Sequence, residues 1–306
     1  MKISSYGGVI AAADKKSAFP LHKIGDTTAV KRIVMNFQQA GIFPIVIVSG
    51  AEENEVRYQL SSNGVVFLNA NEANCLELFY SVKVGFSFLQ DLCEKIVFTP
   101  VNSPMFSPST LRSLMGSEGD IISPSYNGSS GHPMVISDKV IPQILTYQGE
   151  HGLRGAVGTM DNRVWMDVED DGILYTVHDG EVPGEHMNRY NKEMLHLTAR
   201  LNLKKDRVIF DSRTKLLLLL IWKNHSVRAA CQQMALSYSK AWEILNILEE
   251  SLGIQLVIRR HGGSKGGKTT LTGQGYLFLI EYQRMEEDLL SYTQRKSDAF
   301  KTDLGL

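Results

Sequence analysis

Long apolar runs and paired cysteines are both missing from this chain of 306 residues. The longest apolar run, Leu216–Trp222, has seven residues, whereas a membrane-spanning helix needs roughly 18 or more. The amino terminus leads directly into a predicted strand and lacks the pattern of a signal peptide. The three cysteines, Cys75, Cys93 and Cys231, have an odd count and no metal-ligand spacing. These absences exclude membrane proteins and disulfide frameworks, and they predict a protein of the reducing cytoplasm.

Net charge is also nearly absent, at −1, but this value conceals an asymmetry. Residues 204–275 hold 12 Lys and Arg against 5 Asp and Glu, whereas residues 1–203 hold 16 against 22. Positive charge is therefore gathered in one segment, as expected of a local nucleic-acid contact. The length of 306 residues predicts two domains, and we place them at residues 1–200 and 201–306.

The basic segment has a regular order of predicted elements. Ser226–Met234 is predicted as a short helix, and Ser237 as the N-cap of the next helix. Ile254–Arg260 and Thr269–Leu271 are predicted as strands, and Thr272 as the cap of a long final helix. This order is typical of a winged helix-turn-helix.

A glycine-rich basic loop joins the two predicted strands. It can be a wing, an ordinary hairpin tip or a phosphate loop of the nucleotide-binding kind. A phosphate loop requires a helix directly after its Lys-Ser/Thr pair, whereas Lys268-Thr269 enters a strand. The context therefore disfavours the phosphate loop.

Three motifs in this segment carry a family resemblance: Ser237–Trp242, Gly262–Gly267 and Leu271–Gly275. They resemble the DNA-binding domain of molybdate-dependent transcriptional regulators of the ModE type, which is itself similar to that of LysR-type regulators. No molybdate-binding domain of that family is recognisable. The resemblance therefore implies double-stranded DNA as a partner and does not by itself imply a molybdate sensor.

The predicted DNA contacts fall into two groups. Ser237, Tyr238, Ser239 and Lys240 open the reading helix, whose amino end meets base edges or phosphates in the major groove. Phosphate contacts are expected from five basic residues, Arg228, Arg259, Arg260, Lys265 and Lys268. Trp242 lies on the apolar side of the same helix and is predicted as a core residue.

The final helix carries an apolar stripe made of Tyr276, Leu277, Leu279, Ile280, Met285, Leu289 and Leu290. The family resemblance implies that this stripe pairs two chains into a homodimer, which suits palindromic half-sites. The alternative is that the stripe packs onto its own domain.

Strands and helices alternate through the first 100 residues. Strands are predicted at Gly7–Ala13, Phe43–Gly50, Val65–Leu68 and Lys95–Val101, with helices between them. This alternation predicts an α/β fold with a mostly parallel, Rossmann-like sheet. Ligands of such sheets bind beyond the carboxyl ends of the strands, which here are Ala11–Ala13, Ser49-Gly50, Asn69–Asn71 and Asn102.

The same half resembles the MobA-like nucleotidyltransferases, which attach GMP or CMP to molybdopterin. The resemblance rests on Gly8–Ala13, Pro20–Thr28, Leu78–Gly85, Thr99–Phe106 and Gly131–Val135. It implies a nucleotide-diphospho-sugar-transferase-like fold. Together with the strand ends it nominates a nucleotide pocket of Ala11, Ala12, Ala13, Lys15, Asn69, Ser81, Lys83, Asn102 and His132. Ser81 and Lys83 are equally explained as the polar face of a helix, and His132 as a turn residue.

Several residues depart from the family pattern. Ala13 stands at the position of a loop glycine and Phe19 near that of a lysine, although Lys15 or Lys16 can supply a point charge. Asn102, and His178 or Asp179, stand where the family has metal-binding aspartates. An amide brings no negative charge to Mg²⁺, and phosphoryl transfer depends on charge neutralisation. No catalytic residue is therefore assigned, and Mg²⁺ with CTP or GTP is expected only if the domain is active.

An acidic run follows the MobA-like motifs: Asp167, Glu169, Asp170 and Asp171. Such runs are usually solvated surface, with a metal cluster as the alternative.

Two hypotheses follow from the sequence. The first is a transcriptional regulator whose inactive transferase-like domain serves as a platform or as a sensor of a nucleotide or molybdopterin-like effector. The second is an active molybdenum cofactor cytidylyl- or guanylyltransferase that carries a DNA-binding module. Ala13, Phe19 and Asn102 favour the first.

Overall fold

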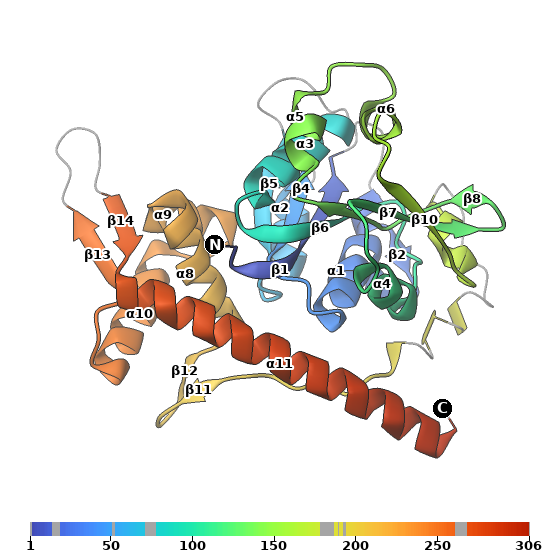
Figure 1. The fold of residues 1–306 in the computed structure, drawn as a ribbon. Coiled ribbons are helices and arrows are strands. Elements are labelled where there is room, and N and C mark those ends of the chain that lie inside the picture. Colours follow the sequence, from blue (N-terminus) through green and yellow to red (C-terminus); the bar gives the residue numbers. More distant parts are fainter. Residues whose placement is uncertain are drawn as a thin grey trace. The chain divides into compact units, whose positions relative to one another are not determined.

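The computed structural model describes residues 2–13, 19–50, 53–70, 78–177, 187–188, 190–191, 194–260 and 268–305. The chain divides into two compact units. Unit 1 comprises Met1–Gln59 and Leu68–His196, and unit 2 comprises Leu60–Phe67 and Leu197–Leu306. Figure 1 shows the sheet and helices of unit 1 in blue to green and the helices of unit 2 in orange to red.

The central sheet has the strand order β10-β7-β9-β6-β1-β4-β5, with β8 (Ser129–Ser130) paired to β7. β1 (Ser4–Ala12) lies between β4 (Ile45–Ser49) and β6 (Cys93–Pro100) and runs parallel to both. β9 (Met134–Ser137) runs antiparallel to both β6 and β7 (Ile121–Tyr126). β10 (Arg163–Asp167) is parallel to β7, and β5 (Val66–Asn69) ends the order beside β4. The predicted α/β class is confirmed as a mixed, mostly parallel sheet, and the antiparallel β9 was not anticipated.

Helices cover both faces of this sheet. α3 (Leu78–Leu89) packs on one face together with α5 (Ile141–Thr146) and α6 (Gly152–Gly158), whereas α1 (Ala29–Gln39) and α4 (Pro108–Met115) lie on the other (Figure 1). Shorter elements complete unit 1: α2 (Glu53–Leu60), the hairpin β2 (Lys23–Ile24) and β3 (Thr27–Thr28), and the 3-10 helices η1 (Phe19–Leu21) and η3 (Asp171–Leu174).

Glycines bring the two helix layers close to β1. A Cβ added at Gly85 of α3 would lie 2.6 Å from Val9 Cγ1, and a Cβ added at Gly8 would lie 2.6 Å from the Phe37 ring of α1. Val9 and Phe37 are fully buried. Since alternate residues of a strand face opposite sides, β1 meets one helix layer through Val9 and the other through Gly8.

Unit 2 contains a run of capped helices. α8 (Ser212–Asn224) is capped by Asp211 and α9 (Val227–Gln233) by Ser226. The predicted caps of the next two helices are confirmed. Ser237 Oγ accepts the Lys240 amide of α10 (Tyr238–Leu252) at 3.3 Å, and Thr272 Oγ1 accepts the Gly275 amide of α11 (Gly273–Leu304) at 2.9 Å.

Two antiparallel strand pairs accompany these helices. β13 (Val257–Arg260) and β14 (Lys268–Leu271) form the predicted hairpin with Val257 opposite Leu271, and β11 (Leu203–Lys204) pairs with β12 (Val208–Phe210). The Thr269 amide of β14 donates to the His225 carbonyl at 3.0 Å. The hairpin is thereby attached to the end of α8. Among the described residues, no helix is both long and apolar enough to cross a membrane.

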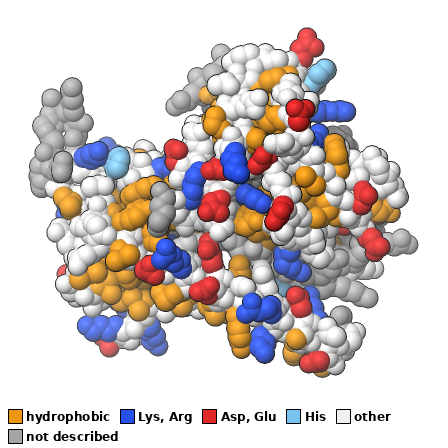
Figure 2. Space-filling view, in the orientation of Figure 1, with side chains coloured by type: hydrophobic (Ala, Val, Ile, Leu, Met, Phe, Trp, Pro, Cys, Tyr) orange, Lys and Arg blue, Asp and Glu red, His pale blue; other side chains and the backbone are white. Residues whose placement is uncertain are grey.

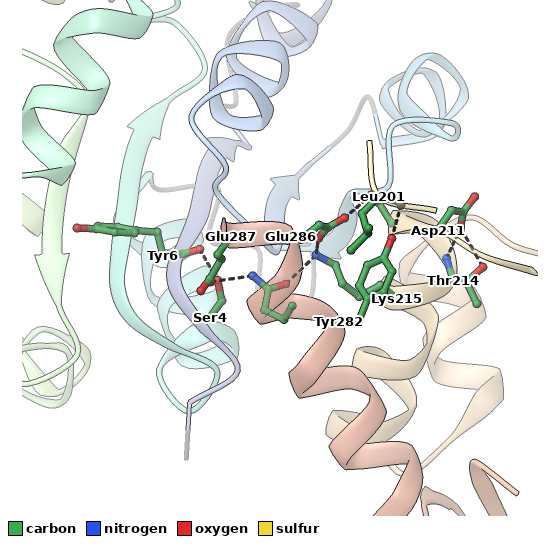
Figure 3. A network of polar contacts seen from close by, with 11 residues as sticks. Ser4, Tyr6, Leu201, Asp211, Thr214, Lys215, Tyr282, Glu286 and Glu287 are labelled. Carbon is green, nitrogen blue, oxygen red and sulfur yellow. Dashed lines mark hydrogen bonds and ion pairs between the residues drawn. The ribbon is translucent and has the colours of Figure 1, made fainter. Parts of the chain in front are cut away.

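A buried cation joins α8 to α11 in unit 2 (Figure 3). Lys215 is 2% exposed, and its Nζ donates to Gln283 Oε1 at 2.7 Å and pairs with the Glu286 carboxylate. Burial lowers the pKa of Lys215, and Glu286 acts in the opposite direction. The neighbouring Tyr282 hydroxyl donates to the Leu201 carbonyl. Because a buried charge is tolerated only when it is paired, this network fixes the relative position of the two helices.

The close approach of α3 to β1 yields a stability prediction. Gly85→Ala forces a methyl group against Val9 and Val48, so we expect the stability of unit 1 to fall by about 1–3 kcal/mol. Gly158→Ala is the matched control, because a Cβ at Gly158 of α6 meets nothing within 4 Å. The effect is measured by hydrogen exchange of the β1 amides at increasing urea concentrations, which gives the unfolding midpoint of unit 1. Equal unfolding midpoints for Gly85→Ala and Gly158→Ala would contradict the packing argument.

Candidate functional site

Three parallel strands of unit 1 end at the same edge of the sheet. Ala11 is in register with Pro100 of β6 and with Val48 of β4, and Ala12 with Ser49. Ala11, Ala12 and Ala13 are at most 6% exposed, and the Ala11 carbonyl accepts the Val101 amide at 2.9 Å. The predicted pocket residues on β1 therefore contribute packed backbone to this carboxyl edge, and they contribute no polar side chain.

Asn102 follows β6 at this edge. Its carbonyl accepts the Val177 amide at 2.7 Å, and its side-chain Oδ1 is buried without a hydrogen-bond partner in the described part of the chain. Buried polar atoms are normally satisfied. An amide oxygen without a donor is suited to a donor or cation supplied by a ligand, although it brings no charge.

His132 packs beside Phe98 of β6, whose ring also contacts Phe86 of α3. The His132 ring contacts the Phe98 ring edge-on, with centroids 5.7 Å apart, and its amide donates to the Ile173 carbonyl at 3.0 Å. Nδ1 is buried and has no partner among the described residues. Burial lowers the pKa of His132 to about 4, so the imidazole is neutral near pH 7. It can accept or donate a hydrogen bond there, but it does not supply a positive charge to a phosphate.

The other predicted pocket residues differ in their surroundings. Ser81 of α3 is fully buried, and its Oγ has no partner in the described residues. Lys83 Nζ donates to the Tyr147 carbonyl at 2.6 Å and lies 4.7 Å from the Phe79 ring centroid. Asn69, at the end of β5, donates to the Glu53 carboxylate. Lys83 and Asn69 are thus held by other parts of unit 1, whereas no described residue holds the Ser81 hydroxyl.

The position that resembles the family lysine is held by an apolar contact. Phe19, in η1, packs against a buried cluster of Ile24, Ala29, Met105, Val177 and Tyr190. The side chain therefore belongs to the apolar packing of unit 1. Lys15, Lys16, His178 and Asp179 lie outside the described residues.

The acidic run contains one residue that was predicted wrongly. Asp170 is 7% exposed; its Oδ2 accepts the Ser107 amide and the Thr110 hydroxyl, both at 2.8 Å, and its Oδ1 accepts the Gly172 amide at 3.0 Å. It therefore joins α4 to η3 and is not solvated surface. Within the described ranges, no group of three or more His, Cys, Asp or Glu side chains is arranged to hold a metal ion.

In unit 2 the predicted reading residues form one exposed run. Ser237, Tyr238, Ser239 and Lys240 are all exposed at the amino end of α10, with Tyr238 at 52%. Lys240 pairs with Glu243 at 2.8 Å. Arg228 of α9 and Lys268 of β14 are also exposed. Figure 2 shows hydrophobic and basic side chains side by side on the visible surface of these helices.

Arg259 of β13 is held across α10 by two contacts. Its guanidinium carbon lies 3.5 Å from the Trp242 ring centroid, and Nη2 donates to Asn246 Oδ1 at 3.3 Å. Trp242 is only half-buried and contacts Tyr238 at a centroid distance of 6.1 Å. The prediction of Trp242 as a core residue was therefore wrong, because Arg259 covers its ring. Arg260 is opposite Lys268 in the hairpin; its side chain and Lys265 lie outside what the structure describes.

Sequence reasoning missed two residues that shape these sites, Asn246 and Arg32, and it misassigned Trp242. Trp242 and Asn246 lie four residues apart on α10, where they share a face, and this spacing before a basic strand was the available signal. Arg32 is a basic residue among the apolar positions of α1. It is 4% exposed, which the sequence pattern alone did not indicate.

The fold of unit 1 indicates the class of protein to which this part of the chain belongs. Unit 1 has an α/β nucleotidyltransferase-like sheet, and a helical region follows it. Residues 14–164 match the family model described as MobA-like NTP transferase domain. This part of the chain is accordingly a MobA-like NTP transferase domain.

Individual proteins show similarity to parts of the chain. A nucleotidyl transferase from Methanothermobacter thermautotroptrophicus is 15% identical, with a TM-score of 0.51 over 62% of this chain and 98% of that one, and it shares the fold alone. Rv0371c from Mycobacterium tuberculosis H37Rv is 21% identical, with a TM-score of 0.48 over 63% of this chain and 100% of that one.

A further similarity is one of sequence and covers only part of the chain. The molybdenum transport protein ModE of Azotobacter vinelandii is 31% identical over 109 residues, which are 35% of this chain. The chain spans 40% of the length of that relative.

The environment of His132 yields a pH prediction. Because its folded pKa of about 4 lies below the ordinary 6.5, the unfolded chain binds a proton between these values that the folded chain does not. The free energy of unfolding should therefore fall as the pH drops from 6.5 towards 4, by about 1.4 kcal/mol per unit at most from this group.

His132→Gln should flatten that part of the pH profile, measured by urea unfolding at each pH. His151→Gln is the control, since the His151 side chain is 79% exposed. A profile for His132→Gln as steep as that of the wild type would contradict the assignment.

Proposed function

We propose that the protein is a DNA-binding transcriptional regulator connected with molybdenum or molybdopterin metabolism. In this proposal residues 201–306 form a winged helix-turn-helix domain. The MobA-like domain serves as a platform or as a sensor of a nucleotide or a molybdopterin-like effector, and it transfers no nucleotidyl group.

The observation that carries the proposal is the exposed amino end of α10 beside a fixed arginine. Ser237–Lys240 present side chains at the end of a capped helix, and Arg259 is held next to them by Trp242 and Asn246. A helix end of this kind fits the major groove, where its first residues meet base edges. An arginine whose rotamer is fixed loses less entropy when it contacts phosphate.

The order of elements supports the same assignment. α8, α9 and α10 are followed by the hairpin β13–β14 and then by α11. The link between α9 and α10 is short, and Ala235 has a φ of 50° within it. A short helix, a tight turn, a capped second helix and a basic hairpin are the parts of a winged helix-turn-helix. The partial similarity to ModE adds to this argument.

The absence of transfer is supported by the carboxyl edge of unit 1. Phe19 packs in an apolar cluster, and Asn102 offers an uncharged oxygen. In the described part of this edge, neither residue supplies the charge that a metal–triphosphate complex requires. Lys83, a cation of α3, is bound to the Tyr147 carbonyl.

The exposed face of α11 supports a homodimer. Of the predicted stripe, Leu277 and Met285 are exposed at 59% and 53%, whereas Leu279 and Ile280 are buried in their own chain. Further exposed apolar side chains follow along the helix: Tyr292, Phe300 and Leu304. A second copy of the same helix is the occupant that suits this stripe. Two-fold pairing would present two reading helices to the half-sites of a palindrome.

The DNA-binding proposal predicts distinct effects for two arginines. A duplex selected by the intact protein from a random-sequence library serves as the probe, and fluorescence anisotropy at several salt concentrations gives the affinity. Arg259→Met should weaken binding several-fold and reduce the slope of log K against log salt by about 1, because one phosphate contact is lost.

Arg284→Met is the matched control. Arg284 is an exposed arginine of α11 that pairs with Glu281 at 2.6 Å and lies on a different helix from the reading residues. Its replacement should leave affinity and salt slope unchanged. Equal losses for the two variants, or selection that enriches no sequence, would overturn the proposal.

The proposed loss of transferase activity has a direct assay. The intact protein is incubated with molybdopterin, Mg²⁺ and either CTP or GTP, and pyrophosphate is measured. We expect no release above the protein-free rate, because the described edge lacks the neutralising charges. Substrate-dependent release of pyrophosphate would instead establish the alternative, an active cytidylyl- or guanylyltransferase with a DNA-binding module.

A further inference from the structure

Arg32 of α1 is a buried cation with an unusual set of contacts. It is 4% exposed, and its guanidinium carbon lies 4.0 Å from the centroid of the Tyr190 ring. Nη2 donates to the Ile24 carbonyl at 3.2 Å and contacts Met187 Sδ at 3.8 Å. The guanidinium is therefore held between the β2 strand, α1 and an aromatic ring.

Two of its three nitrogens have no acceptor in the described part of the chain. Nε and Nη1 are buried and lack a hydrogen-bond partner in the described residues, and no carboxylate of that part of the chain pairs with Arg32. Burial lowers the pKa of Arg32, and the Tyr190 hydroxyl acts in the opposite direction. A guanidinium stays protonated in proteins. An unpaired buried charge is strongly destabilising, so a buried guanidinium whose Nε and Nη1 lack an acceptor in the described residues is suited to an added anion.

The location fits a ligand site. Tyr190, whose ring contacts Arg32, shares a buried cluster with Met105 and Val177. Met105 follows β6, and the Val177 amide donates to the carbonyl of Asn102. Arg32 is thus connected to the carboxyl edge of the sheet, where open α/β sheets bind ligands.

Tyr190 covers the guanidinium and is held by a short chain of hydrogen bonds. Its hydroxyl donates to Asn36 Oδ1 at 2.6 Å, and Asn36 Nδ2 donates to the Phe106 carbonyl at 3.0 Å. The ring face and hydroxyl of a neutral tyrosine attract a cation only weakly, whereas an oxyanion forms charge-assisted hydrogen bonds that are roughly twice as strong as neutral ones. An oxyanion can therefore displace the ring.

We propose that Arg32 binds a phosphate-type oxyanion, either free or as part of a nucleotide, and that Tyr190 competes with this anion for the guanidinium. This proposal deepens the sensor role proposed above for the MobA-like domain. Its test uses no DNA, so the two proposals can fail separately.

The experiment is isothermal titration calorimetry of the intact protein with pyrophosphate, CTP and cytidine at constant ionic strength. Pyrophosphate and CTP should bind and cytidine should not, since it carries no phosphate. Tighter binding of CTP than of pyrophosphate identifies a nucleotide as the source, and equal binding identifies the free anion. Binding of cytidine as tight as that of CTP would overturn the proposal.

Arg32→Met should lower the affinity for pyrophosphate about 10-fold or more, because hydrogen bonds to a charged group are lost. Lys31→Met is the matched control: it removes the same charge from the neighbouring, exposed position of α1 and should leave the affinity unchanged. Equal losses in the two variants would show a general charge effect and overturn the site.

Tyr190→Phe is a second test of the proposal, to be used if the Arg32→Met variant does not fold. This variant keeps the ring and removes the hydroxyl that bonds Asn36, so the cover is held less firmly and pyrophosphate should bind several-fold more tightly. Unchanged or weaker binding would show that Tyr190 does not compete, and an absence of pyrophosphate binding in the wild type would show that Arg32 is structural only.

Discussion

The packing of β1 between two helix layers is the constraint on which unit 1 depends. Val9 contacts α3 where Gly85 has no side chain, and Gly8 leaves room for Phe37 of α1. Interiors are packed as densely as organic crystals, so both approaches set the distance between sheet and helix. The parallel register of β1 with β4 and β6 then brings three strand ends to a common edge. The candidate ligand edge is therefore a consequence of small residues in the middle of the sheet.

Buried polar groups are distributed unevenly over this fold. Asp170 receives three hydrogen bonds and Lys215 has two partners, so both are satisfied by the chain. Arg32, Asn102 and His132, by contrast, each keep a buried polar atom without a partner in the described residues. Since an unsatisfied buried group costs about 1–3 kcal/mol or more, such groups are expected where a ligand completes them. Arg32 and Asn102 are both tied to the cluster beyond the end of β6.

Local signals in the sequence predicted the elements well. Ser237 and Thr272 are N-caps as expected, and α2 (Glu53–Leu60) and α3 (Leu78–Leu89) lie between the predicted strands, as the alternation indicated. Such features depend on residues close in sequence. The roles of Trp242 and Asp170 were predicted wrongly because they depend on distant partners. Arg259 reaches Trp242 from another element, and Asp170 accepts hydrogen bonds from residues about 60 positions earlier.

The same limit applies to charge. The count of 12 Lys and Arg against 5 Asp and Glu in residues 204–275 treats every cation alike. Lys215 is buried, and it is paired with Glu286, which lies beyond that segment, so it adds nothing to an external field. Arg259 is exposed although its guanidinium lies over the Trp242 ring. Because an aromatic ring attracts a cation only weakly, the positive charge of Arg259 stays available to a ligand. The residues suited to binding a polyanion are therefore the cations that no carboxylate of the chain pairs with. Composition only limits the number of candidates.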